Sequence, residues 1–121
     1  MTDYLPKFKP GQAVTFTASA DITGGRLVEV TGGRTVAHAA DDSAKVVGVA
    51  GFDAKSGECV TVFTRAGGVH SLTVTGAVEA GAQVSAAAGG KAQTVGATTN
   101  PIGLALEGAT AANDVIDVLF I

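Results

Sequence analysis

The segment KVVGVAGFDAKSGECVTVFT, residues 45–64, contains two valine-rich runs separated by a small polar stretch. In the second run, Val60 and Val62 alternate with Thr61. Successive side chains of a β-strand point to opposite faces, and β-branched residues favour such a pleated, half-buried surface. The segment therefore predicts strands over 45–52 and 59–64 that are joined by a loop over 53–57.

Short runs of the same kind continue on both sides of this segment. They predict further strands at 13–17, 26–30, 69–75, 82–86, 91–95, 102–107 and 114–120. Segments 37–44 and 108–113 are small and polar and are expected to be loops. Glycine pairs between the runs predict tight hairpins, because two-residue turns favour positive φ: Gly32-Gly33, Gly67-Gly68 and Gly89-Gly90. Many short strands without a helical period favour an all-β barrel or sandwich.

The two halves of the chain resemble each other at an offset of 55 to 57 residues. The matching segments are 22–28 with 78–84, 47–50 with 102–105, and 60–63 with 116–119. Self-similarity of this kind indicates a duplicated β unit, although glycine and valine are common enough here to match by chance. Two copies of one β unit around a single core would give a pseudo-symmetric β-barrel, which we expect as one domain over residues 13–121.

The composition limits both the core and the partners. Hydrophobic residues make up 46% of the 121 residues but aromatic residues only 5%, so the core must consist of aliphatic side chains. The few large core side chains are expected to be Phe16, Phe52, Phe63 and Phe120. Charged residues make up 16%, below the usual value of about 25%. Such a surface suits a protein packed against neighbours, and it equally suits an ordinary small domain.

Several classes of function and location are disfavoured. The net charge is −3 and the basic residues are scattered among few aromatic ones, so no nucleic-acid partner is expected. No stretch approaches the roughly 18 apolar residues of a membrane span, and residues 1–10 lack the apolar core of a secretory signal. Cys59 is the only cysteine, which forbids an intrachain disulfide and fits a reducing cytoplasm.

Reactive residues are present but form no motif. Cys59 opens an apolar strand and is expected to be a buried structural residue, since a nucleophile needs a base nearby. His38 and His70 lie in separate segments without zinc-ligand spacing and are expected at the surface or an interface.

The acidic residues fit turns better than catalysis or calcium binding. Asp41-Asp42 has no calcium-loop frame around it, and Glu107 and Asp114 flank a loop. Glycine motifs for phosphate binding and a serine nucleophile motif are lacking. We expect no enzyme activity, catalytic residue, metal, cofactor or small-molecule substrate.

The first twelve residues, MTDYLPKFKPGQ, predict an extended N-terminal arm over 1–12. Pro6 and Pro10 exclude a helix and remove donors that a central strand needs. Tyr4, Leu5 and Phe8 are large apolar residues that are unfavourable in solvent unless they dock on a surface. The arm is therefore expected to bind a partner.

The segments YLPKFKPGQAVTFTASADITGGRLVEV, KVVGVAGFDAKSGECVTVF and NPIGLALEGATAANDVIDVLF together resemble the small capsid decoration, or head cement, proteins of tailed phages. The resemblance covers essentially the whole chain. It rests on the order and spacing of several short motifs, none of which is a catalytic signature.

The resemblance implies a compact β-barrel or β-tulip that forms a homotrimer. The trimer would bind the outer face of the phage capsid and cement contacts between major capsid protein subunits. The resemblance also implies a virion location after synthesis in the host cytoplasm, and a capsid-binding arm that contains Tyr4, Leu5, Lys7, Phe8 and Lys9. The alternative is a β-sandwich surface- or carbohydrate-binding module of a phage or bacterial appendage. The absence of tryptophan and the single tyrosine, Tyr4, disfavour a sugar platform.

Overall fold

The computed structural model describes residues 12–65, 68–95 and 100–121, and its regular structure consists of strands apart from one 3₁₀ turn. The all-β prediction is confirmed. The elements are β1 (Ala13–Ala18), β2 (Leu27–Gly32), β3 (Thr35–His38), β4 (Val46–Ala50), β5 (Cys59–Thr64), β6 (Val69–Thr73), β7 (Gln83–Ala87), η1 (Ala88–Gly90), β8 (Lys91–Thr94), β9 (Pro101–Ala105) and β10 (Val115–Phe120).

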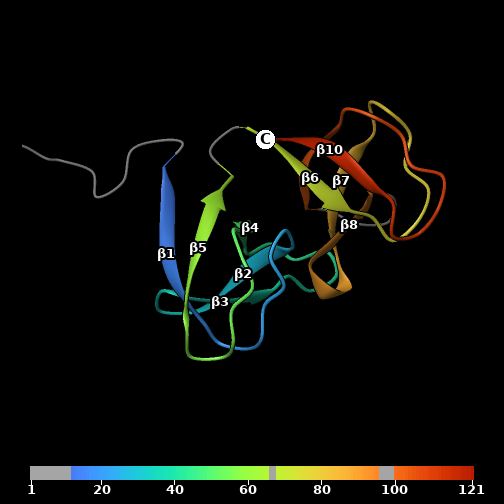
Figure 1. Cartoon of the computed structure of the whole chain (residues 1–121). Coiled ribbons are helices and arrows are strands. Elements are labelled where there is room, and N and C mark those ends of the chain that lie inside the picture. The colour runs from blue at the N-terminus through green and yellow to red at the C-terminus, as the bar shows by residue number, and fades with distance from the viewer. Residues whose placement is uncertain (1–11, 66–67, 96–99) are drawn as a thin grey trace, which may run out of the picture.

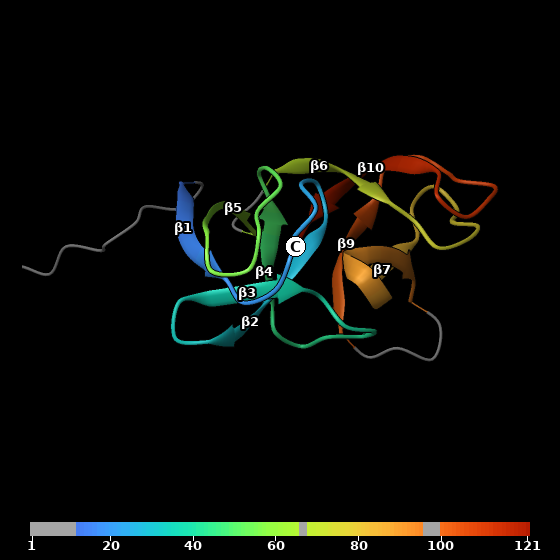
Figure 2. The same cartoon turned by 60° about the horizontal axis from the view of Figure 1, so that its bottom comes forward.

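The strands form two units, which lie beside each other in Figures 1 and 2. The first repeat, β1 to β5, is a closed barrel in the order β1-β3-β2-β4-β5. The second repeat, β6 to β10, is a five-stranded sheet in the order β6-β10-β9-β7-β8. A parallel pairing of β1 with β3 closes the barrel, whereas β6 meets β8 through one parallel bridge, between Val74 and Ala92.

The predicted duplication accounts for this arrangement. Strands β1, β5, β4, β2 and β3 follow one another around the barrel in the same order as β6, β10, β9, β7 and β8 in the second sheet. The isolated antiparallel bridge between Ile22 and Ala54 has a counterpart between Val78 and Ala109. The structure therefore repeats one β unit at the offset that the sequence indicated.

Two hydrophobic clusters fill the molecule, where a single core was expected. One lies inside the barrel and includes Val28, Val60 and Val62. The other lies within the second repeat and also takes in Leu27 and Val49 of the first. Adjacent residues of β2 thus serve different clusters, because their side chains point to opposite faces of the strand. Each unit curls around its own core, and the apolar outer face of β2 and β4 joins the two.

Two local predictions were wrong. Residues 37–38 were expected in a loop but belong to β3. The strands on either side of the Gly67-Gly68 pair do not form a hairpin: β5 pairs with β1 and β4, and β6 pairs with β10. The duplication places β5 and β6 in different repeats, so their connection crosses between units. The other two glycine pairs do join paired strands, β2 with β3 and β7 with β8.

The expected phenylalanine core is half correct. Phe16 and Phe120 are buried, at 9% and 4% exposed. Phe63 is 45% exposed because it shares the outward face of β5, opposite to the inward-facing Val60 and Val62. Phe52 is 49% exposed and follows the end of β4. The core is therefore almost wholly aliphatic.

Polar contacts also link the repeats. The guanidinium of Arg65, just after β5, donates to the carbonyl oxygens of Val46 at 3.3 Å and of the C-terminal Ile121 at 3.3 Å. The backbone N–H and side-chain amide of Asn100 bond the side chain and carbonyl of Asp42, each at 3.0 Å. These bonds fix the two units against each other at two separate places.

Candidate functional site

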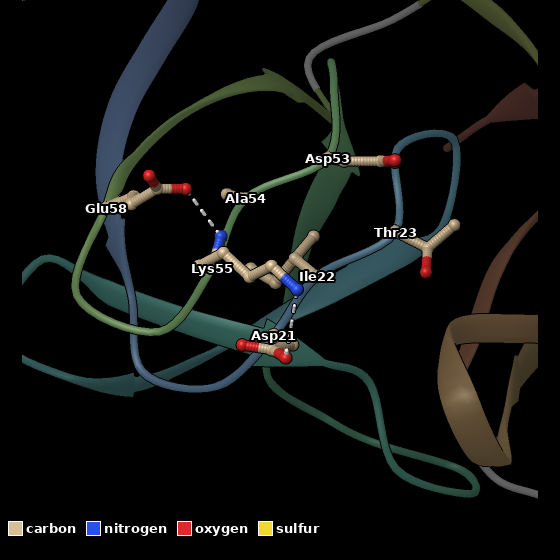
Figure 3. Close-up of a pocket in the computed structure, with 7 residues that line it drawn as sticks. All are labelled: Asp21, Ile22, Thr23, Asp53, Ala54, Lys55 and Glu58. Atoms are coloured by element: carbon tan, nitrogen blue, oxygen red, sulfur yellow. Dashed lines mark hydrogen bonds and ion pairs between the residues drawn. The ribbon is translucent and has the colours of Figure 1, made fainter.

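A hollow of about 430 Å³ at one end of the barrel is lined by Asp21, Ile22, Thr23, Asp53, Ala54, Lys55 and Glu58 (Figure 3). Its carboxylates accept backbone N–H groups: Asp21 from Ser56 at 3.0 Å and Asp53 from Gly24 at 2.7 Å. Glu58 accepts the backbone N–H of Lys55 at 2.7 Å, and the Lys55 ammonium lies 3.9 Å from Asp21. These groups hold the surrounding loops together, so the hollow is a structural feature of the turns.

Among the other acidic candidates, Asp42 and Asp114 have the turn roles that were predicted for them, whereas Glu107 bonds the backbone of strand β10. Asp114 accepts the backbone N–H groups of Thr110 and Ala111 at 3.1 and 3.2 Å. Glu107 accepts the backbone N–H of Asp117 at 2.9 Å. In the Asp41-Asp42 pair, Asp42 adopts a positive φ of 51°, a conformation that aspartate tolerates in turns. The carboxylates thus order loops.

Cys59 is exposed, so the expectation of a buried cysteine was wrong. The reason is alternation, since its neighbour Val60 points into the barrel and Cys59 must therefore point outward. The two strand histidines lie in different repeats. Burial, followed by the positive charge of Arg26, lowers the pKa of His38, whose Nε2 accepts the Thr23 N–H at 2.9 Å.

His70 occupies an aromatic cluster at the junction of the repeats. Its ring centroid lies 4.8 Å from that of Phe120 and 6.3 Å from that of Phe63. Burial lowers the pKa of His70. Among residues 12–65, 68–95 and 100–121, no three His, Cys, Asp or Glu side chains are grouped so that they could hold a metal ion. The same described part contains no helix long and apolar enough to span a membrane.

The arm residues Tyr4, Leu5, Lys7, Phe8 and Lys9 lie outside the described residues. The described chain begins at Gln12, and β1 follows directly at Ala13. The proposed role of the arm therefore stays a prediction.

An apolar surface covers the outer face of β6, β10 and β9, which are neighbours in the second sheet, and β6 and β10 lie side by side in Figures 1 and 2. We define this outer apolar patch by five residues: Val69, Leu104, Leu106, Val115 and Leu119. Leu104 is half-buried and the other four are exposed. Ser71 and Asp117 lie between them and bond each other at 3.0 Å.

The alternation in strand β10 already indicates this patch in the sequence, although the predictions from the sequence did not include the patch. Residues 115–120, VIDVLF, alternate between exposed and buried, and the inward side holds Ile116, Val118 and Phe120. The outward side holds Asp117 together with two apolar residues, Val115 and Leu119. Apolar residues on the solvent side of an alternating strand point to a covered surface.

Comparisons with known proteins identify a family for this chain and a solved structure with a similar fold. The family model for phage cement proteins matches residues 8–120. Among solved structures, the fold resembles that of the head fiber gp8.5 N base in bacteriophage phi29, with a TM-score of 0.74 and 18% sequence identity. The similarity covers 91% of this chain and 93% of that chain. At this identity the likeness shows a shared fold. A search of curated proteins found no match.

Proposed function

Because this chain belongs to the phage cement protein family, whose model matches residues 8–120, we propose that it binds the outer face of a tailed-phage capsid and stabilises the contacts between major capsid protein subunits. The family match carries this proposal. By this match the chain is a capsid-associated structural protein. The proposal adds that the chain binds the outer face of the capsid, that the major capsid protein is its partner, and that it assembles as a homotrimer.

The chemistry of the described residues supports a structural role. The carboxylates around the barrel hollow and in the loops are engaged by backbone N–H groups. Two packed β units, joined by a shared apolar cluster, provide a stiff body with short loops. A cement protein needs such a body and an anchor, and it needs no reactive group.

We assign the anchor to the N-terminal arm. Tyr4, Leu5 and Phe8 supply apolar contacts, and Lys7 and Lys9 supply charge at the rim. An extended segment can add a strand to the edge of a partner's sheet, with main-chain hydrogen bonds giving affinity. Three arms on one trimer would multiply weak individual contacts through their high effective concentration.

Decoration of capsids that lack this protein tests the proposal. Purified wild-type protein should bind such capsids and raise the temperature at which they break. Deleting residues 2–9 should sharply reduce occupancy while leaving the thermal unfolding of the free protein nearly unchanged, since β1 begins only at Ala13. Phe8→Ala should lose part of the affinity, by about 2 kcal/mol for a buried interface aromatic.

The double variant Lys7→Ala/Lys9→Ala is the matched control within the arm. It should weaken binding less than Phe8→Ala, and its effect should shrink as salt concentration rises. Failure of the wild-type protein to bind capsids would refute the function. Full occupancy by the truncated protein would refute only the role of the arm and would leave the proposed function standing.

A further inference from the structure

One edge of the second sheet is open. Strand β6 is terminal in the order of that sheet, and its one neighbouring strand is β10. On the other side, no residue from Val69 to Thr73 has a partner among the described strands, and the single parallel bridge to β8 begins at Val74. Val69 is 51% exposed, so this edge reaches solvent. An unpaired row of backbone N–H and C=O groups is a template for a further strand.

The odd-numbered residues of β6 direct their backbone groups to this open edge. The carbonyl of Gly68 accepts an N–H group of β10 at 3.0 Å, and the N–H of Val74 donates to Asp114, just before β10, at 2.9 Å. Even-numbered residues therefore bond β10, because the direction of bonding alternates along a strand. Val69 and Ser71 then present their N–H and C=O groups to the open side.

The equivalent edge of the first repeat is protected. Thr15 of β1 corresponds to Ser71, and its carbonyl accepts the guanidinium of Arg34 at 3.2 Å. Strand β3 also pairs with the last two residues of β1. In the second repeat the counterpart of Arg34 is Lys91, which bonds Asn113 at 2.8 Å instead. Among the described residues, Ser71 therefore has no such cap over its backbone.

The N-terminal arm has the sequence of a strand that pairs along one edge only. Pro6 and Pro10 are four residues apart, so in an extended chain both lie on the same edge, where they offer no N–H. The opposite edge has an uninterrupted row of donors at the odd-numbered residues from Asp3 to Lys9. Prolines on the outer edge also prevent the addition of yet another strand.

The point where the arm joins the body fixes its direction along β6. The arm leads into β1 at Ala13, which pairs with Phe63. The ring centroid of Phe63 lies 6.3 Å from that of His70, near the start of β6. An arm that follows β6 from this end runs antiparallel to it. Residues 10–12 can span about 10 Å between Ala13 and the paired part of the arm.

We propose that in the free protein the arm adds antiparallel to the open edge of β6 in its own chain. In this register Lys9 lies opposite Val69. Lys7 lies opposite Ser71, and it shares a face with Asp117, the partner of Ser71 on β10. The lysines of the arm are therefore on the solvent side of the sheet, beside an exposed carboxylate.

The other face of the arm meets the apolar side of β6. Tyr4, Pro6 and Phe8 are even-numbered and share the face of His70 and Leu72. Leu72 is buried, and His70 already packs against phenylalanine rings. Docking thus pairs an open strand edge and removes the large apolar side chains of the arm from water in one step.

The inference rests on the proposed function in one respect, the strand-adding role of the arm, and it adds a regulation of that role. The arm has one complete row of donors, so it cannot pair with β6 and with a capsid sheet at the same time. Binding to the capsid therefore requires the arm to leave β6. Until then, the chain covers its own open edge.

Amide hydrogen exchange of the full chain, resolved by residue with NMR, tests the proposal. The N–H of Ser71 should exchange about ten times more slowly in wild type than in the variant lacking residues 2–9. Lys7→Pro removes the N–H that bonds β6 and should abolish this protection. Lys7→Ala is the matched control, because it removes the charge and keeps the N–H, and it should retain most of the protection.

Two results would overturn the proposal. One is an exchange rate at Ser71 that is the same in wild type and in the truncated variant. The other is protection that falls on dilution from about 1 mM to 50 μM, because a docked arm of the same chain is independent of concentration. The global thermal unfolding should change little in either variant, since the arm adds only an edge strand.

Capsid decoration separates this inference from the proposed function. Decoration that needs the arm, together with exchange at Ser71 that does not depend on the arm, would overturn the inference and leave the function standing. Arm-dependent protection in a protein that does not bind capsids would support the inference and refute the function.

Discussion

Gly48 and Gly103 occupy equivalent positions in the two repeats, and replacing either with alanine should be strongly destabilising. A Cβ atom at Gly48 would collide with the backbone carbonyl of Phe63 and the Cα of Thr64 on the neighbouring strand β5. At Gly103 it would lie 2.6 Å from the carbonyl oxygen of Leu119 and 2.7 Å from a methyl group of Val118. Because backbone atoms block the space, a side-chain rotamer change cannot relieve the clash.

The expected cost follows from these contacts. Overpacking a tight site costs about 1–3 kcal/mol. Separating β4 from β5 weakens one or two ladder hydrogen bonds, worth about 1 kcal/mol each. We therefore expect Gly48→Ala to lower the free energy of unfolding by about 2–5 kcal/mol. Gly103→Ala should cost somewhat less, because part of its clash involves the Val118 side chain, which can shift.

Urea and thermal unfolding measure these changes, and Gly33→Ala is the control. A Cβ at Gly33 meets nothing within 4 Å, so that variant should lie within about 1 kcal/mol of wild type. For a chain of this size, 3 kcal/mol corresponds to a fall in Tm of roughly 10 °C. A Gly48→Ala protein as stable as Gly33→Ala would refute the close strand approach on which the reasoning depends.

Three further outcomes test other parts of the structure. Cys59→Val should change the free energy of unfolding by less than about 1 kcal/mol, and Cys59 should react with a thiol reagent in the native protein, because its side chain is exposed. Arg65→Ala should cost about 1–3 kcal/mol in urea unfolding, because it removes the bonds to carbonyls of both repeats. Burial lowers the pKa of His70, so the unfolded state binds more protons near pH 6 and stability should fall as pH drops below about 6.5. His70→Gln should reduce that fall in a pH series of urea midpoints, whereas an unchanged pH dependence would show that His70 does not cause it.

Local patterns in the sequence were enough to predict every strand except β3, the repeat, and the turn roles of Asp42 and Asp114. Alternation in Val60-Thr61-Val62 and in residues 115–120 is a property of neighbouring residues, so it is readable without the fold. The match of 22–28 with 78–84 indicated a duplicated unit, and the paired bridges at Ile22 and Val78 confirm it. The same alternation assigns Cys59 to the outward face of its strand, although its apolar neighbours had favoured a buried position.

The tertiary structure alone decided which strands are neighbours and which faces are covered. Gly67-Gly68 resembles a hairpin turn, but β5 and β6 belong to different repeats, and strand pairing depends on contacts distant in sequence. Leu27 is buried and Gln83 exposed at equivalent positions because another unit packs on the first repeat and the second repeat lacks such a cover within the described chain. A period of two gives two faces to every strand, but only the packing of whole units determines whether the second face meets water, another repeat or another molecule.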